Sequence, residues 1–106
     1  MNSDRFLSML GLCMRAGRLS VGHDAAKQSI RDKKAFLCIM TADASARLVE
    51  EMKTLCASSP LIVTDYGMED IKTAIGKKAG VMSVNDEGFA NTLRELRNKE
   101  GSAYGN

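Results

Sequence analysis

Six consecutive apolar residues, from Ala35 to Met40, constrain the fold of this chain more than any other feature of its sequence. A run of this length without polar alternation is typical of a β-strand that is covered on both of its faces. It is the longest apolar run in the chain, and it falls well short of the roughly 20 residues that cross a membrane. We therefore expect a sheet with helices on both sides, and no membrane partner.

Short apolar stretches alternate with amphipathic ones along the rest of the chain. The predicted strands cover residues 35–41, 61–64 and 80–84, with 19–21 as a further edge strand. The predicted helices cover residues 3–16, 24–32, 45–56 and 68–75, and a last helix follows residue 85 or 86. Strands that alternate with helices predict an α/β fold, a three-layer α-β-α sandwich with some parallel strand pairs.

Glycines and small polar residues mark the expected ends of these helices. Ser3 is a candidate N-cap of the first helix, and Gly17 is its stop signal. Asp43 or Ser45 is placed to cap the third helix, and Gly76 ends the fourth.

The third helix carries the clearest amphipathic pattern in the chain. Its apolar stripe comprises Leu48, Val49, Met52, Leu55 and Cys56. We expect Leu48, Met52 and Leu55 to pack against Leu37 and Ile39 of the central strand.

Residues 1–100 are expected to form a single domain, because a chain of 106 residues is long enough for one hydrophobic core. The polar, glycine-rich end, residues 101–106, is expected to be disordered. Cys13, Cys38 and Cys56 are an odd number and lie far apart in the sequence. They disfavour a disulfide framework, indicate a reducing cytoplasm, and are interpreted as packed thiols.

Charge is distributed unevenly along the chain, although the net value is only +2. Residues 1–34 hold seven Lys or Arg side chains against three Asp or Glu. A locally basic surface favours an anionic partner. Charge alone leaves open the alternative of an ordinary solvated face.

No pattern in the sequence indicates an enzyme, a cofactor or a resident metal. His23 stands alone, without the partners that a metal site or a general base needs. The glycines match neither the dinucleotide-binding nor the P-loop pattern. Glu50 and Glu51 are neighbours on a helix, point about 100° apart, and are interpreted as solvated.

Asp43 has a second interpretation besides helix capping. Open α/β sheets bind ligands at the carboxyl ends of their strands, so Asp43 with Thr41 and Ser45 is a candidate site for a metal or a small molecule. Capping is the favoured interpretation, and we expect no small-molecule substrate.

The segment from Arg15 to Lys27 combines cations with a glycine at a helix start. Arg15, Arg18 and Lys27 flank Gly22, where the helix N-terminus offers unpaired N–H groups and a partial positive charge to a phosphate. Lys34 continues the basic edge. The chain has no tryptophan, and its few aromatic residues are expected to be mostly buried, which disfavours a stacking platform for single strands. A structured RNA fits better.

Several sequence blocks recur in the order typical of a known family. They are Leu10-Gly-Leu-Cys-Met-Arg-Ala-Gly-Arg18, Val21-Gly22, Ile30-Arg31, Thr41-Ala-Asp-Ala-Ser45, Ala74-Ile-Gly-Lys77 and Val84-Asn-Asp-Glu-Gly-Phe-Ala90. From about Phe6 to Leu96 the chain resembles the ribosomal L-seven-Ae family, the kink-turn-binding superfamily, in its bacterial YlxQ-like branch. The resemblance implies a mixed four-stranded sheet in an α-β-α sandwich. It also implies a non-catalytic, ribosome-associated or regulatory protein that binds structured RNA, with ribosomal RNA among the candidates.

The resemblance also implies where the RNA binds. Family members dock a sharply bent RNA on a loop and helix start, here residues 22–28, and on an apolar loop before the last strand, here residues 79–81. The RNA-binding residues expected on the resemblance and on charge are Arg15, Arg18, Gly22, His23, Asp24, Lys27, Gln28, Lys34, Lys77, Lys78, Ala79, Gly80 and Val81.

Three positions depart from the pattern Gly-x-Asn-Glu-x-x-Lys of the archaeal and eukaryotic relatives. Asp24 replaces the asparagine, Ala25 the glutamate and Gln28 the lysine. Asp24 cannot donate a hydrogen bond, Ala25 makes none through its side chain, and Gln28 lacks the charge. These changes weaken base recognition more than phosphate binding. The alternative is therefore a protein-interaction module on the same fold that has lost RNA binding.

Overall fold

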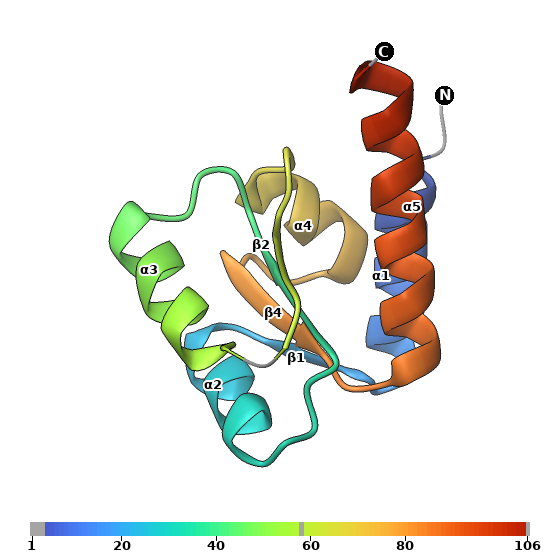
Figure 1. Cartoon of the computed structure of the whole chain (residues 1–106). Coiled ribbons are helices and arrows are strands. Elements are labelled where there is room, and N and C mark those ends of the chain that lie inside the picture. The colour runs from blue at the N-terminus through green and yellow to red at the C-terminus, as the bar shows by residue number, and fades with distance from the viewer. Residues whose placement is uncertain (1–3, 58, 106) are drawn as a thin grey trace.

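The computed structural model describes residues 4–57 and 59–105, over which five helices and a four-stranded sheet form an α/β fold (Figure 1). The elements are α1 (Arg5–Arg15), β1 (Leu19–Val21), α2 (His23–Arg31), β2 (Leu37–Met40), α3 (Ala46–Leu55), β3 (Leu61–Val63), α4 (Met68–Ile75), β4 (Val81–Val84) and α5 (Glu87–Gly105). The predicted fold class is confirmed. No helix in the described part of the chain is both long and apolar enough to span a bilayer.

The sheet is mixed, with the strand order β1-β4-β2-β3. β2 pairs in parallel with β3, whereas β4 lies antiparallel to both β1 and β2. The residues 19–21 thus form an edge strand, as predicted. Val84 of β4 is paired on one side with Leu19 and on the other with Leu37, which fixes the register at that end of the sheet.

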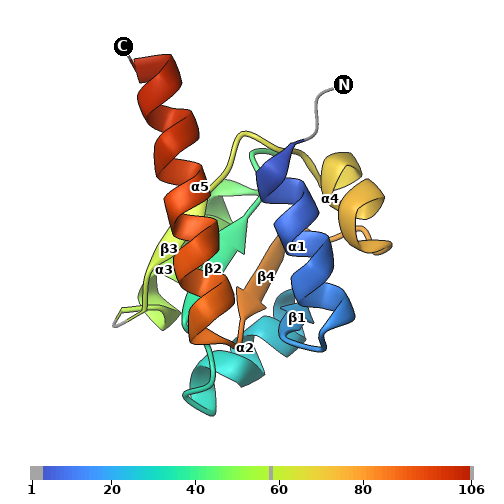
Figure 2. The ribbon, with the colours of Figure 1, turned by 90° about the vertical axis from the view of Figure 1, so that its right-hand side faces the viewer.

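Helices cover both faces of the sheet (Figure 2). α1, α4 and α5 pack on one face, and the core there includes Phe6, Leu37, Ile39, Ile71 and Leu93. α2 and α3 pack on the other face, where a smaller core comprises Ala26, Cys38, Met40, Met52, Cys56 and Val81. The three cysteines are buried free thiols, as interpreted from the sequence.

α3 packs against the opposite face of β2 from the one expected. Met52 contacts the cluster that contains Cys38 and Met40, whereas Leu37 and Ile39 face α1, α4 and α5. Side chains alternate between the two faces of a strand, so one face of β2 takes the even-numbered residues and the other face the odd-numbered ones. A run that is apolar on both faces does not reveal which helix covers which face.

The helix caps agree with the expectation for α3 and differ from it for α1. Ser3 lies outside the described residues, and the N-cap of α1 is Asp4, whose carboxylate accepts the N–H of Leu7. Ser45 caps α3 as predicted, with its hydroxyl accepting the N–H of Leu48. Asp43 does not cap α3; its carboxylate accepts the N–H of Met68, the first residue of α4, at 3.2 Å, whereas the N-cap of α4 is Gly67.

α5 runs from Glu87 to Gly105 and so includes residues 101–105. The expected disorder of residues 101–106, based on their polar and glycine-rich composition, stays a prediction.

Candidate functional site

α2 begins at a glycine with a backbone conformation that other residues rarely adopt. Gly22 has φ of 97° and ψ of 166°, and it caps α2 without a side-chain hydrogen bond. Its N–H donates to the carbonyl oxygen of Val81 at 2.9 Å, which ties the start of α2 to β4. The first-turn N–H groups of α2 receive no side-chain cap and are available to an anionic ligand.

The loop before β4 lies against this helix start. The carbonyl oxygen of Gly80 accepts the N–H of Thr41 at 3.0 Å, so the loop is held at the end of β2. Ala79 is buried, whereas Lys77 and Lys78 are exposed. Val81 follows this loop and accepts the N–H of Gly22, so two segments far apart in the sequence lie side by side. We call the surface formed by residues 22–28 and 77–81 the α2-start surface.

Two of the predicted RNA-binding residues on α2 contact α3. His23 Nε2 lies 3.0 Å from a carboxylate oxygen of Glu51, and Lys27 Nζ lies 3.7 Å from the same oxygen. The hydrogen bond from His23, together with the charges of His23 and Lys27, holds the pKa of the Glu51 carboxyl below its ordinary value. Glu51 remains 40% exposed, as its interpretation as a solvated residue implies, but its carboxylate also joins α3 to α2, which the sequence did not indicate.

Lys78, a predicted RNA-binding residue on the loop before β4, also forms an ion pair. Lys78 Nζ lies 3.0 Å from Glu69, at the start of α4, and this hydrogen bond and charge raise the pKa of the Lys78 ammonium. Lys78 is therefore less available to a phosphate than the sequence suggested.

The pKa of the Asp43 carboxyl is also shifted. The Thr41 hydroxyl and the Met68 N–H hold this pKa below its ordinary value.

The proposed ligand set at Asp43 is used for capping. Asp43 accepts the N–H of Met68 at the start of α4, and Ser45 caps α3, so both side chains already accept backbone N–H groups. Over the described residues, no three His, Cys, Asp or Glu side chains come together as a group that could hold a metal ion.

The positions expected to contact bases lie on the exposed side of α2. Asp24, Ala25 and Gln28 are all exposed. The Gln28 amide donates to the carboxylate of Asp32 at 3.0 Å, one turn further along the helix. Binding a base through Gln28 therefore requires exchange of this surface hydrogen bond.

Arg18 and Lys34 lie at the other end of the sheet, not beside Gly22. The carbonyl oxygen of Arg18 accepts the N–H of Asn85, just past the end of β4, and Lys34 follows the C-terminus of α2. A helix the length of α2 spans about 13 Å at 1.5 Å per residue. The predicted cations are therefore distributed over both ends of β1 and α2, and do not all lie beside Gly22.

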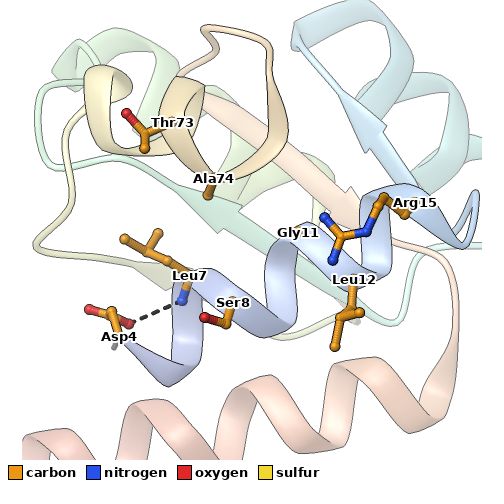
Figure 3. A pocket seen from close by; sticks show the side chains of 8 residues that line it. All are labelled: Asp4, Leu7, Ser8, Gly11, Leu12, Arg15, Thr73 and Ala74. Atoms are coloured by element: carbon orange, nitrogen blue, oxygen red, sulfur yellow. Dashed lines mark hydrogen bonds between the residues drawn. The ribbon is translucent and has the colours of Figure 1, made fainter. Parts of the chain in front are cut away.

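Arg15 lies in a third place, on the opposite face of the sheet. It lines a hollow of about 510 Å³ between α1 and α4, together with Leu7, Leu12 and Ala74 (Figure 3). Gly11 allows the two helices to approach here, since a Cβ at that position would lie 2.9 Å from the carbonyl oxygen of Ala74.

Sequence reasoning missed two residues of interest. Glu51 lies three residues after Leu48 and directly before the buried Met52, a spacing that already indicates a position at the edge of the buried face. Phe36 was expected to be buried with most other aromatic residues, yet 44% of its surface is exposed. Its place just before a fully buried strand gave no indication of this exposure.

Comparison with known proteins identifies the family of the chain. The sequence matches the Ribosomal protein L7Ae/L30e/S12e/Gadd45 family over residues 4–94. It is 30% identical to "RNA-binding protein YlxQ" of Enterococcus faecium, over 90% of this chain and 93% of that protein. It is 24% identical to the large ribosomal subunit protein eL30 of Candida albicans, over 90% and 93% of the two chains.

Solved structures with the same fold are also found. A protein of unknown function from Bacillus halodurans superposes with a TM-score of 0.85 at 28% identity, covering 91% of this chain and 99% of that one. A 15.5 kD RNA-binding protein of Giardia lamblia shares the fold, with a TM-score of 0.73 at 17% identity over 93% and 90% of the chains. The predicted resemblance is confirmed: the chain belongs to the Ribosomal protein L7Ae/L30e/S12e/Gadd45 family.

Proposed function

We propose that this protein binds structured RNA without catalysing a reaction, and that the RNA contacts the α2-start surface. The observation that carries the proposal is the hydrogen bond from Gly22 to Val81, because it joins the two segments expected to dock RNA. Relatives from Enterococcus faecium and Bacillus subtilis are named RNA-binding proteins, and others are ribosomal proteins. These names support RNA as the partner, ribosomal RNA as one candidate, and a cytoplasmic, ribosome-associated or regulatory role.

The chemistry of the surface suits phosphate positioning. The open N–H groups of the first turn of α2 carry the positive end of the helix dipole, and Gly22 has no side chain to obstruct a phosphate. Lys77 is exposed and forms no ion pair within the described residues. Lys77 therefore binds phosphate without first leaving a carboxylate.

The ion pairs set the strength of this binding. Lys27 and Lys78 each exchange a carboxylate for a phosphate when RNA binds, so their net contribution is smaller than that of a free cation. Asp24, Ala25 and Gln28 provide less base recognition than the asparagine, glutamate and lysine of the archaeal and eukaryotic relatives. We therefore propose that a kink-turn-like RNA is bound mainly by shape and phosphate contacts, and weakly.

A salt titration tests the proposal. The affinity of the purified protein for a labelled kink-turn RNA and for a straight duplex is measured by fluorescence anisotropy at several salt concentrations. We expect the affinity to fall steeply with salt, and we expect Lys77→Ala to reduce the magnitude of the salt slope by roughly one unit for both RNAs.

Lys53→Ala is the matched control, because Lys53 is exposed on α3 and pairs with Glu50 on its own helix. This substitution should leave both affinities unchanged. If neither RNA binds, or if Lys77→Ala has no effect, the α2-start surface does not bind RNA. A role as a protein-interaction module then explains the fold better.

A further inference from the structure

Four cations lie near the end of α2 that is remote from Gly22. They are Arg18, Arg31, Lys33 and Lys34. All four are exposed, and none of them takes part in an ion pair within the described residues. Their only acidic neighbour in the segment 31–34 is Asp32, which accepts a hydrogen bond from Gln28. These four side chains therefore form a group of exposed cations without ion-pair partners among the described residues, and Asp86, next to Asn85, is an acidic neighbour on the Arg18 side.

Asn85 holds the segments that carry these cations together. Its N–H donates to the carbonyl oxygen of Arg18 at 2.8 Å, and its side-chain oxygen accepts the Ser29 hydroxyl. The carbonyl oxygen of Ser29 in turn accepts the N–H of Lys34 at 2.9 Å. Ser29 is buried, so the link between β1, β4 and α2 is shielded from solvent.

Phe36 lies at the same end of the sheet. Its N–H donates to the carbonyl oxygen of Val84 at 2.8 Å. Arg18 and Phe36 each precede a residue that pairs with Val84, on opposite sides of β4. Their backbones are therefore two strand spacings apart, or about 10 Å. Phe36 exposes 44% of its surface there.

The backbone of Lys33 adds an independent observation. Lys33 has φ of 59°, and it is the only non-glycine residue with a positive φ among the described residues. It follows the last turn of α2, a position that glycine or asparagine usually fills. The N–H of Lys33 donates to the carbonyl oxygen of Ile30 and the N–H of Lys34 to that of Ser29, the bonds that normally end a helix with a left-handed residue, so glycine can replace Lys33 without strain.

We propose that Phe36 with Arg18, Arg31, Lys33 and Lys34 forms a second RNA contact, which we call the far-end patch. An unpaired base stacks on the Phe36 ring, and the phosphates on either side of this base bind the four cations. Stacking accepts any base, and phosphate binding is independent of sequence, so the patch takes a single-stranded segment without sequence preference. The inference rests on the proposed function, and it adds a flanking single strand to the structured RNA at the α2-start surface.

Fluorescence tests the stacking step directly. The chain has no tryptophan, so Phe36→Trp introduces a single indole at the patch. We expect single-stranded oligouridylate to quench this indole in a saturable manner, because a stacked base lies against the ring. Leu12→Trp is the matched control: Leu12 is 46% exposed, lies on α1 on the opposite face of the sheet, and should show no saturable quenching.

Lys33→Gly tests the charge without endangering the fold. Glycine adopts a positive φ freely, so this variant should unfold at the same or a higher urea concentration than the wild type. It should nevertheless bind oligouridylate at least threefold more weakly, because a phosphate partner is lost. Phe36→Ala should weaken the same binding at least fivefold.

The outcomes separate this inference from the proposed function. Absence of quenching in Phe36→Trp, with unchanged oligouridylate affinity in Phe36→Ala and Lys33→Gly, overturns the far-end patch, even where the kink-turn RNA still binds. Equal quenching by oligoglutamate also overturns it, because the patch then takes any polyanion, including an acidic peptide. Quenching by oligouridylate alone supports the patch, and loss of kink-turn binding in Lys77→Ala reports separately on the α2-start surface.

Discussion

At the scale of single residues, Gly22 is the position on which the site depends most. Its φ of 97° and ψ of 166° lie in a region that is almost exclusive to glycine. A Cβ at Gly22 would meet no atom within 4 Å, so the penalty of a substitution is backbone strain and not a clash. The hydrogen bond to Val81 holds this conformation in place.

We expect Gly22→Ala to lower the free energy of unfolding by about 1–3 kcal/mol. Chemical denaturation with urea at neutral pH measures this change. A loss below about 0.5 kcal/mol would mean that the turn relaxes easily, and that its geometry is not what positions the start of α2.

Asp43 predicts a pH dependence of stability. Its carboxyl pKa is lower in the folded protein than the ordinary value of 3.8, owing to the Thr41 hydroxyl and the Met68 N–H. The charged form therefore stabilises the fold above the unfolded-state pKa, and this stabilisation is lost as the pH falls through the folded-state pKa. We expect Asp43→Asn to be less stable than the wild type at pH 7, with a difference that shrinks below about pH 4.

Urea unfolding at pH 7 and at pH 3 checks this expectation. Glu50→Gln is the control, since Glu50 is exposed and, among the described residues, its carboxylate forms an ion pair only with Lys53 of its own helix. A difference between the wild type and Asp43→Asn that is equally large at both pH values would show that the carboxylate charge does not hold the start of α4.

The role of a single residue could be predicted from the sequence where it depends on the local backbone conformation. It could not be predicted where it depends on a partner that is distant in the sequence. Gly22 follows from its place between a short strand and a helix, because a glycine is needed at such a turn. The partners of Asp43 and Glu51 lie on other elements, and no local pattern names them. Lys27 was correctly placed on α2, but its pairing with Glu51 depends on how α3 packs.

At the scale of elements, α3 shows how burial within one helix varies. Met52 is fully buried against Cys38 and Met40, whereas Leu48 is only half buried at the edge of the same cluster. We expect Met52→Ala to lower the free energy of unfolding by about 2–5 kcal/mol, and Leu48→Ala by clearly less. Urea denaturation of both variants measures the difference. Equal losses would contradict the observed orientation of α3.

Periodicity predicted the elements better than their packing partners. The order of helices and strands follows from alternating apolar runs and amphipathic stripes, and β2 follows from its unbroken apolar run. The pairing order β1-β4-β2-β3 does not follow from these patterns, because strands that are buried on both faces look alike in sequence. The family resemblance supplied the mixed, four-stranded sheet.

At the scale of the whole molecule, the fold divides the basic N-terminal third into separate surfaces. Arg15 lines the hollow between α1 and α4, Arg18 and Lys34 lie at the far end of the sheet, and Lys27 lies against α3. A count of charges along the sequence treats these cations as one group. The course of β1 and α2 in the structure places these cations at both ends of α2. An RNA that contacts most of these cations must therefore extend over both ends of this helix.

The central claim is that RNA docks on the α2-start surface, and the double variant Asp24→Asn with Gln28→Lys tests it most directly. The two substitutions restore an amide donor and a charged donor on the exposed side of α2. Affinities for one kink-turn RNA and one straight duplex are compared by calorimetric titration. We predict that the double variant binds the kink-turn at least tenfold more tightly than the wild type, about 1.4 kcal/mol, with a smaller gain for the duplex. Kink-turn affinity no better than duplex affinity in the double variant would contradict the account.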